Sequence, residues 1–158
     1  MKAILMSIKP KWVVKILNGE KTIEIRKTMP KCEFPIDVYI YCLKDRKYGY
    51  MHNGQSIRPS SVVAKFTLNK VEKIDYDYPP EPYETFYRKS CLTPCELFDY
   101  IGHHPWYIYH IENLEIFDRP KELSEFKTYK TYNLKDLHNC HLSLVRPPQS
   151  WCYIESED

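Results

Sequence analysis

Glycine is scarce in this sequence, and long apolar runs are missing from it. Only 4 of the 158 residues are glycine, and none belongs to a glycine-rich loop of the kind that holds nucleoside triphosphates, which excludes P-loop chemistry. No apolar stretch approaches the roughly 20 residues that a membrane-spanning helix needs. The apolar part of the first ten residues is too short for a secretory signal. We therefore predict a globular protein of the cytosol (cytoplasmic), with no membrane partner.

The six cysteines lack the regular spacing of a disulfide framework or a zinc finger. Without a secretory signal, we interpret them as thiols in a reducing compartment. Cys91, Cys95, His138, Cys140 and His141 offer enough groups for a zinc site, but paired CxxC spacing is absent, and the apolar neighbours of Cys95 on a predicted helix favour a buried thiol. No cysteine has a recognisable activating context. The sequence predicts no metal and no cofactor.

Charge is almost balanced overall but unevenly placed. The net charge is +2, yet residues 1–31 hold eight Lys and Arg against two Glu, and the remainder is net acidic. A basic segment of this kind favours a phosphate-bearing partner. A solvated helix face would give the same count, so both interpretations stay open.

The N-terminal segment has the pattern of a strand followed by a helix. Residues 3–8 are a short apolar strand, and Pro10 suits the first position of a helix. Asn18 and Gly19 provide the C-terminal stop. The helix is predicted to have a core face and a basic face, with apolar residues Trp12, Val13, Ile16 and Leu17 opposite Lys11 and Lys15.

Strict alternation of polar and apolar residues follows this helix. In a strand, Ile23 and Ile25 point to one side, and Thr22, Glu24 and Arg26 to the other. The glycine stop brings Lys21 to the start of the same strand. We therefore predict that Lys21, Glu24 and Arg26 share one pocket. An exposed, salt-bridged strand face is the alternative.

The rest of the chain predicts a mixed architecture. A capping box starts a helix at Thr93, with Pro94 first, Glu96 third and Gly102 at its end; Leu97, Phe98 and Ile101 are expected in the core. Several short strands without a β-α-β rhythm favour an α+β fold around a small barrel. We expect one domain over residues 1–158, strands at 37–43, 61–71, 106–117 and 151–154, helical turns at 120–126 and 134–137, and a proline-rich surface loop at 75–83.

The N-terminal motif resembles the ASCH family of the PUA-like superfamily, in its small bacterial or phage type. The resemblance is carried by Ser7-Ile8-Lys9-Pro10 and by Ile16-Leu17-Asn18-Gly19-Glu20-Lys21-Thr22-Ile23-Glu24-Ile25-Arg26, and more loosely by residues 38–43, 62–67 and 146–151. It implies a small PUA-like β-barrel, mixed and mostly antiparallel, with short helices around it. It also implies a cleft beside the first helix that is associated with RNA binding and RNA-linked chemistry.

One branch of this family comprises small bacterial amidohydrolases that act on N4-acetylcytidine with a lysine, a threonine and a glutamate. The resemblance places Lys21 at the lysine position. Glu24 stands at the threonine position, and Lys65 stands where the glutamate is expected. If Glu24 and Lys65 faced each other, they would form a buried pair rather than the family's acid/base set.

We therefore predict a protein that binds RNA or a nucleobase-containing small molecule. Arginine and lysine hold phosphate or base acceptors, and glutamate accepts from an exocyclic amine. The expected ligand-binding residues are Lys9, Lys11, Lys15, Lys21, Thr22, Glu24, Arg26, Tyr41, Lys65, Ser150 and Trp151, with Lys9, Lys11 and Lys15 on phosphates.

The sequence leaves two alternatives open. The first is an enzyme of RNA metabolism, either an amidohydrolase or a metal-independent ribonuclease, with Lys21 and Glu24 as the catalytic proton-handling pair. The second is a protein partner docked on the tyrosines between Tyr76 and Tyr87. Base stacking on Trp12, Tyr39, Tyr41 or Trp151 is a further hypothesis, although packing in the core is the commoner role of such residues.

Overall fold

The computed structural model describes residues 1–45, 51–129 and 143–156. The predicted helical turn at 134–137 lies outside these residues, as do His138, Cys140 and His141. In chain order the elements are β1 (Lys2–Ile8), α1 (Pro10–Leu17), β2 (Ile23–Arg26), β3 (Ile36–Cys42), β4 (Met51–His52), β5 (Gln55–Ser56), β6 (Ser61–Leu68), β7 (Val71–Ile74), α2 (Tyr83–Ser90), α3 (Pro94–Ile101), β8 (Trp106–His110), β9 (Glu112–Lys121), the 3-10 helix η1 (Leu123–Glu125) and β10 (Trp151–Glu155).

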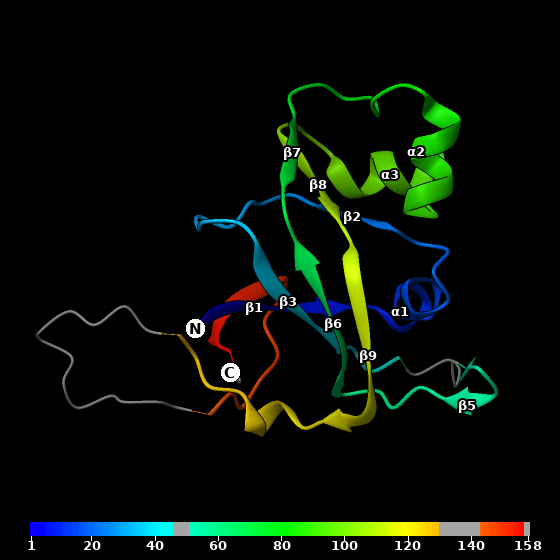
Figure 1. Ribbon diagram of the computed structural model, residues 1–158. Helices are drawn as coiled ribbons and strands as arrows, with labels where there is room; N and C mark the ends of the chain where they lie inside the picture. The colour runs from blue at the N-terminus through cyan, green and yellow to red at the C-terminus, as the bar shows by residue number, and fades with distance from the viewer. Residues whose placement is uncertain (46–50, 130–142, 157–158) are drawn as a thin grey trace, which may run out of the picture.

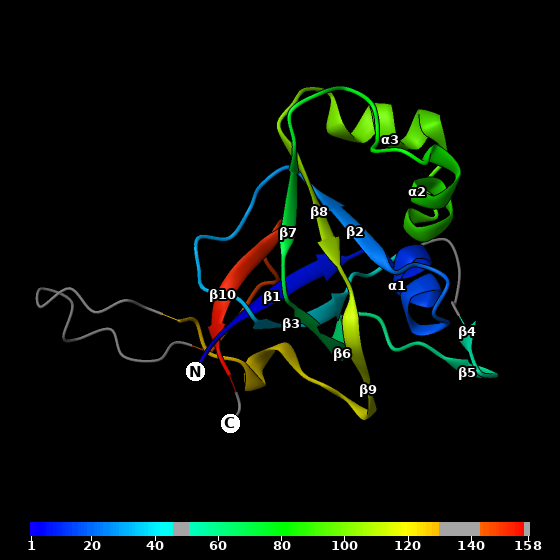
Figure 2. The ribbon, with the colours of Figure 1, turned by 45° about the horizontal axis from the view of Figure 1, so that its top comes forward.

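Two sheets organise the molecule (Figures 1 and 2). The larger has the order β10-β1-β3-β6-β9 and the smaller has the order β2-β8-β7. β1 and β3 are parallel, and the other pairings of these sheets are antiparallel. The mixed α+β class predicted from the sequence is confirmed, and closure into a barrel stays a prediction.

The two sheets are joined through long paired segments. β6 and β7 are separated by two residues, and β8 and β9 by one. β6 pairs with β9 in the large sheet, and β7 pairs with β8 in the small one. The same two chain segments therefore run from one sheet to the other, and β2 joins the small sheet by pairing with β8.

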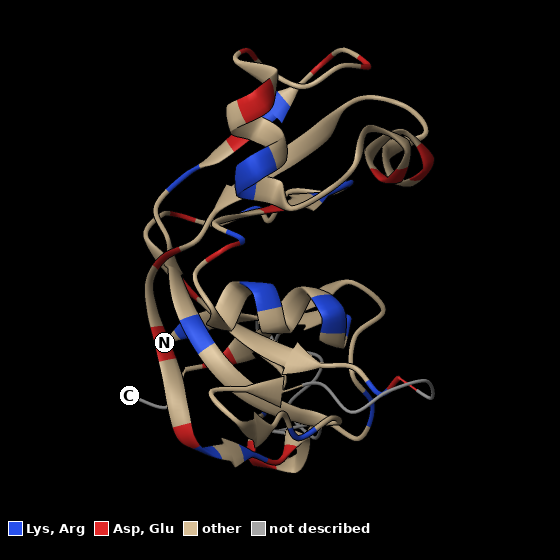
Figure 3. Ribbon diagram, turned by 90° about the vertical axis from the view of Figure 1, so that its right-hand side faces the viewer, with Lys and Arg blue, Asp and Glu red and all other residues tan. Residues whose placement is uncertain are grey.

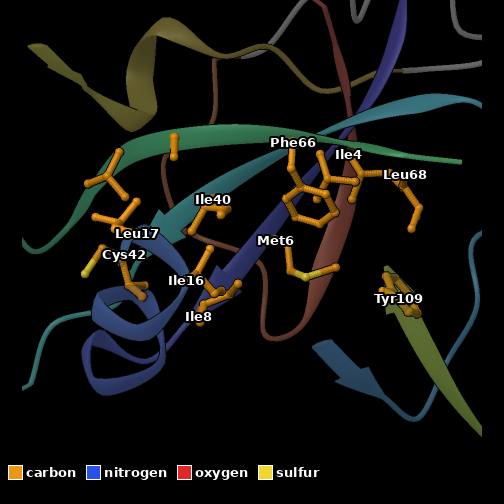
Figure 4. Packing of buried hydrophobic residues seen from close by; sticks show 14 of the residues in the cluster. Ile4, Met6, Ile8, Ile16, Leu17, Ile40, Cys42, Phe66, Leu68 and Tyr109 are labelled. Atoms are coloured by element: carbon orange, nitrogen blue, oxygen red, sulfur yellow. The ribbon is translucent and has the colours of Figure 1, made fainter. Parts of the chain in front are cut away.

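The main core lies between α1 and the large sheet (Figure 4). Val13, Ile16 and Leu17 of α1 are buried there, as their spacing predicts, and Leu68 and Tyr109 lie at the end of the cluster away from α1. A separate apolar cluster joins α2 and α3 to the small sheet around Trp106. The main core supports one wall of a pocket that lies between α1 and β2, and the second cluster supports the other wall.

Helix α3 begins as its sequence predicts. Thr93 Oγ1 accepts from the Glu96 N–H, and Glu96 Oε2 accepts from the Thr93 N–H, so the capping box is complete. Leu97 and Ile101 are buried, but Phe98 is 48% exposed. The core prediction for Phe98 is wrong because a helix turns about 100° per residue, which carries Phe98 away from the face shared by positions 97 and 101.

The sequence did not predict α2 or the hairpin of β4 and β5. α2 follows the proline-rich loop, and Asn53 and Gly54, both at positive φ, form the turn between β4 and β5, which lie between the predicted strands 37–43 and 61–71. Among the described residues, no helix is long and apolar enough to cross a membrane.

Candidate functional site

A pocket of about 240 Å³ opens between α1 on one side and β2 and α3 on the other. One wall is the end of β1 with the first turn of α1, and the other is β2 with Leu92 and Tyr100. Residues that precede β10 complete it from the far end of the chain. The described lining residues are Ser7, Ile8, Lys9, Trp12, Lys21, Glu24, Ile25, Arg26, Leu43, Leu92, Tyr100, Gln149 and Ser150.

The turn at Gly19 brings the charged residues of β2 into this pocket. Gly19 has a φ of +76°, which glycine adopts at little steric cost. β2 then runs antiparallel to β8, with Glu24 opposite Tyr109 and Arg26 opposite Tyr107. Glu24 and Arg26 are two residues apart and therefore point to the same side of the strand.

Lys21, Glu24 and Arg26 form a compact buried cluster. Lys21 Nζ lies 3.3 Å from Glu24 Oε2, and Arg26 Nη2 lies 3.1 Å from Glu24 Oε1. The exposed fractions of the three residues are 2%, 7% and 7%. Charged residues are almost never buried this far unless they are paired, so the alternative of a solvent-exposed strand face is wrong.

Both cations are also held by distant parts of the chain. Lys21 Nζ donates to the carbonyl of Ser90, the last residue of α2, at 2.7 Å. Arg26 Nη2 donates to the Ser7 carbonyl at 2.9 Å, and Nη1 donates to Ser150 Oγ at 3.2 Å. The guanidinium therefore ties β2 to the end of β1 and to the segment before β10.

Two polar atoms of this cluster have no hydrogen-bond partner among the described residues. They are Glu24 Oε2 and Arg26 Nε; Lys21 Nζ approaches Oε2 without making a hydrogen bond. An unsatisfied buried group costs roughly 1–3 kcal/mol. Because both atoms are fully buried, an occupant of the pocket would offset that cost only if these side chains shifted to expose them.

The charge of the pocket favours an electron-rich or anionic ligand. Lys9, Lys21 and Arg26 line it against one carboxylate, Glu24, among the described residues. Tyr100 adds a phenol whose pKa is raised by burial, an effect that the positive charge of Arg26 opposes and Glu24 reinforces. The Tyr100 hydroxyl is therefore a neutral hydrogen-bond donor at neutral pH.

Lysine recurs along α1 (Figure 3), but the lysines of the predicted basic face differ in what they contact. Lys9 lines the pocket. Lys11 pairs with Glu96 of α3 and Lys15 pairs with Glu20, each at 3.4 Å. Thr22 is exposed and faces a second, open concavity beside Arg88 and Lys89 rather than the pocket.

Like Lys11, Lys15 and Thr22, three further predicted ligand-binding residues lie outside the pocket. Tyr41 is buried in a core cluster with Tyr39 and Phe126. Lys65 does not face Glu24, because its strand, β6, pairs with β3 and β9, and its ammonium lies 3.4 Å from Asp37 and 3.7 Å from Glu115. Trp151 Nε1 donates to Thr28 Oγ1 at 2.9 Å, and its ring packs against the main core.

Other pocket residues escaped the sequence argument. Trp12 was assigned mainly to the core, yet it is only partly buried and lines the pocket, with Lys11 Nζ 4.3 Å and Lys21 Nζ 5.2 Å from its ring centroid. Tyr100 was not singled out. Its position on α3, three residues after the buried Leu97 and next to the buried Ile101, was the available signal, because this spacing places the ring at the edge of the core face of the helix.

The tyrosine-rich segment is exposed, as a docking surface requires. Tyr76, Tyr78 and Tyr83 are 38%, 55% and 44% exposed, and the rings of the first two lie 4.7 Å apart. No contact identifies a partner for this surface, so a protein partner stays a prediction.

The described cysteines do not form a metal centre. Cys91 is half-buried and Cys95 is exposed, so the prediction that Cys95 is buried is wrong. Leu97 and Ile101 occupy the core face of α3 in its place. No group of three potential ligands occurs within 1–45, 51–129 and 143–156.

Burial makes Cys42 a poor nucleophile. Desolvation raises the pKa of its thiol to about 11, so on the order of 0.1% is thiolate at pH 8. We expect iodoacetamide to label the exposed Cys95 promptly and to label Cys42 only after unfolding, as measured by peptide mass mapping. Equal labelling rates for the two thiols in the native protein would contradict this burial.

Comparisons with known proteins identify the architecture. No protein-family model and no curated protein matches the sequence. The fold is similar to crystal structures of an ASCH protein from Zymomonas mobilis. A serine-to-alanine mutant of that protein gives a TM-score of 0.65 at 19% identity, over 97% of this chain and 88% of that chain. A tyrosine-to-phenylalanine mutant gives 0.63 at 19%, over 98% and 91%.

A third structure of the Zymomonas mobilis ASCH protein gives a TM-score of 0.58 at 20% identity, over 98% of this chain and 89% of that chain. The similarity therefore extends over nearly all of both chains. At this identity it establishes the fold, and the predicted ASCH resemblance is confirmed at that level.

Proposed function

We propose that this chain is a single-domain ASCH-type protein, acting in the cytosol, whose pocket binds RNA or a nucleobase-containing small molecule. The observation that carries the proposal is the buried, ion-paired cluster of Lys21, Glu24 and Arg26, which lines the pocket. Among the described residues, Glu24 Oε2 and Arg26 Nε have no hydrogen-bond partner. A carboxylate beside a guanidinium offers an acceptor next to a donor. The polar edge of a nucleobase offers the complementary pair.

The size and walls of the pocket also suit such a ligand. Its volume of about 240 Å³ lies just below the range of about 300–1,000 Å³ that is usual for drug-sized ligands, which favours one base or nucleoside unit. Trp12 and Tyr100 come from opposite walls, on α1 and α3. Aromatic side chains of this kind are the usual stacking surfaces for unpaired bases.

Binding is favoured over hydrolysis by the chemistry of the lining residues. The alternative enzyme needs a proton-handling pair, and Lys21 and Glu24 are close enough to be one. However, Glu24 is paired with two cations, and Lys65, at the family's glutamate position, is paired elsewhere with Asp37 and Glu115. The pocket therefore lacks, among the described residues, the second carboxylate that would complete an acid/base set.

Titration of a fluorescently labelled short single-stranded RNA tests the proposal. We expect the combined variant Lys21→Ala and Arg26→Ala to weaken binding by roughly 100-fold, since each charge-assisted hydrogen bond contributes about 1.5–3 kcal/mol. Raising the salt concentration should weaken binding to the parent protein.

The matched control is Lys73→Ala. Lys73 is an exposed lysine on β7 that pairs with Asp75 at 3.3 Å and does not line the pocket. The Lys73→Ala variant should bind RNA as the parent does. Circular dichroism should confirm that every variant is folded. Affinity that is indifferent to salt and to the Lys21 and Arg26 substitutions would refute the proposal.

A further inference from the structure

We propose that the ligand of this pocket carries a phosphate ester, and that the phosphate lies at the N-terminus of α1 beside Lys9. This inference rests on the proposed function and narrows it: the occupant is a nucleotide or a phosphodiester strand rather than a free nucleoside. The inference rests on three features that lie together at one end of the pocket: a helix end that no side chain caps, a lysine with no ion-pair partner among the described residues, and a buried arginine.

The start of α1 breaks the usual rule for helix ends. Its N-cap residue is Lys9, no side chain caps the helix, and its first turn holds no acidic residue. The N-terminus of a helix carries a partial positive charge that favours anions and disfavours cations. A lysine at this position therefore adds to an unfavourable field, and a bound anion would reverse the effect.

Arg26 supplies a second and independent observation. It is 93% buried, lines the same pocket, and its Nε has no hydrogen-bond partner among the described residues. Its Nη2 donates to the carbonyl of Ser7, two residues before Lys9. The guanidinium therefore lies at the same end of the pocket as the start of α1, so its positive charge adds to the field that an anion there would meet.

The ion pairs of the neighbouring lysines indicate which lysine is available to the phosphate. Lys11 and Lys15 each pair with a glutamate, whereas the described residues provide no ion-pair partner for Lys9. We therefore place the phosphate at Lys9, rather than along the whole basic face that the sequence suggested.

Calorimetric titration of the full chain distinguishes a phosphate site from a base site. The ligands are the four common ribonucleosides, their 5′- and 3′-monophosphates, a short single-stranded oligoribonucleotide and inorganic phosphate. We expect at least one monophosphate or the oligonucleotide to bind about tenfold or more tightly than the nucleosides. A preference for the oligonucleotide over every monophosphate would identify a strand, and the reverse would identify a free nucleotide; either result supports the phosphate site.

Lys9→Ala and Lys15→Ala form a matched pair of variants. Both remove one lysine from the helix segment, but Lys15 is already paired with Glu20. Lys9→Ala should weaken the binding of phosphate-containing ligands about five- to tenfold and leave the affinity for nucleosides unchanged. It should also lower the slope of affinity against salt concentration by about one counterion. Lys15→Ala should stay within about twofold of the parent.

The failures of the two proposals are distinguishable. Equal affinity for nucleosides and nucleotides, together with no effect of Lys9→Ala, would overturn the phosphate site and leave the base-binding pocket standing. Binding of inorganic phosphate as tight as that of any nucleotide would show an anion site without base recognition and overturn the inference as stated. Absence of binding by every ligand, in a folded parent protein, would overturn both proposals.

Discussion

Replacing Glu24 by glutamine should destabilise the protein by about 3–5 kcal/mol, because the change leaves two buried cations without a counterion. Lys21 Nζ and Arg26 Nη2 lie 3.3 and 3.1 Å from the Glu24 carboxylate, in a site where all three side chains are less than 10% exposed. A loss of this size is a large part of the roughly 5–15 kcal/mol that stabilises a typical domain. The measurement is urea-induced unfolding followed by circular dichroism.

Glu20→Gln is the matched control. Glu20 also pairs with a lysine, Lys15 at 3.4 Å, but its side chain is 55% exposed. Exposed pairs of this kind contribute about 0–1 kcal/mol, so the control should unfold close to the parent. Equal losses for Glu20→Gln and Glu24→Gln would mean that burial does not govern the strength of the Glu24 interactions.

The sequence was sufficient to predict this cluster because all of its members are local. A glycine stop and an alternating strand fix where Lys21, Glu24 and Arg26 point, and both are readable over eight residues. The same holds for the capping box of α3. Local rules of this kind depend on backbone geometry, and they held for Glu24, Arg26 and the capping box. They failed for Thr22, which precedes β2 and faces another concavity.

The rest of the pocket depends on contacts that no local rule encodes. Ser150 reaches Arg26 only because β10 pairs antiparallel with β1. Lys65 was expected opposite Glu24 from the resemblance alone, but the pairing of β6 with β3 and β9 places it beside Asp37 and Glu115. Strand pairing over such sequence distances decides which residues meet, and one sequence does not reveal it.

Helix α2 was missed for a different reason. Only Phe86 and Ser90 of its eight residues are buried, so the apolar periodicity that indicates a helix is almost absent. Its charges give a weaker signal, since Glu84 lies in the first turn and Arg88 and Lys89 lie in the last. This helix matters to the site because its last residue, Ser90, accepts the hydrogen bond from Lys21.

Replacing the whole cluster should separate stability from binding. Buried charged triads can often be exchanged for apolar residues of similar size with little loss of stability, whereas removing one member is costly. We expect the triple variant Lys21→Met, Glu24→Leu and Arg26→Met to unfold within about 2 kcal/mol of the parent, even though the Ser7 and Ser90 carbonyls lose their donors. It should therefore be clearly more stable than Glu24→Gln, as measured by the same urea titration.

The affinity of the same triple variant for RNA and nucleotides should fall by more than about 100-fold, because the charged groups of Lys21, Glu24 and Arg26 no longer line the pocket. A protein that folds as well as its parent but no longer binds would mean that the cluster is kept for its ligand, since it adds little to stability over an apolar replacement. A triple variant as unstable as Glu24→Gln would instead make the cluster a structural element. Parent-like affinity in a folded triple variant would place the binding surface elsewhere on the molecule.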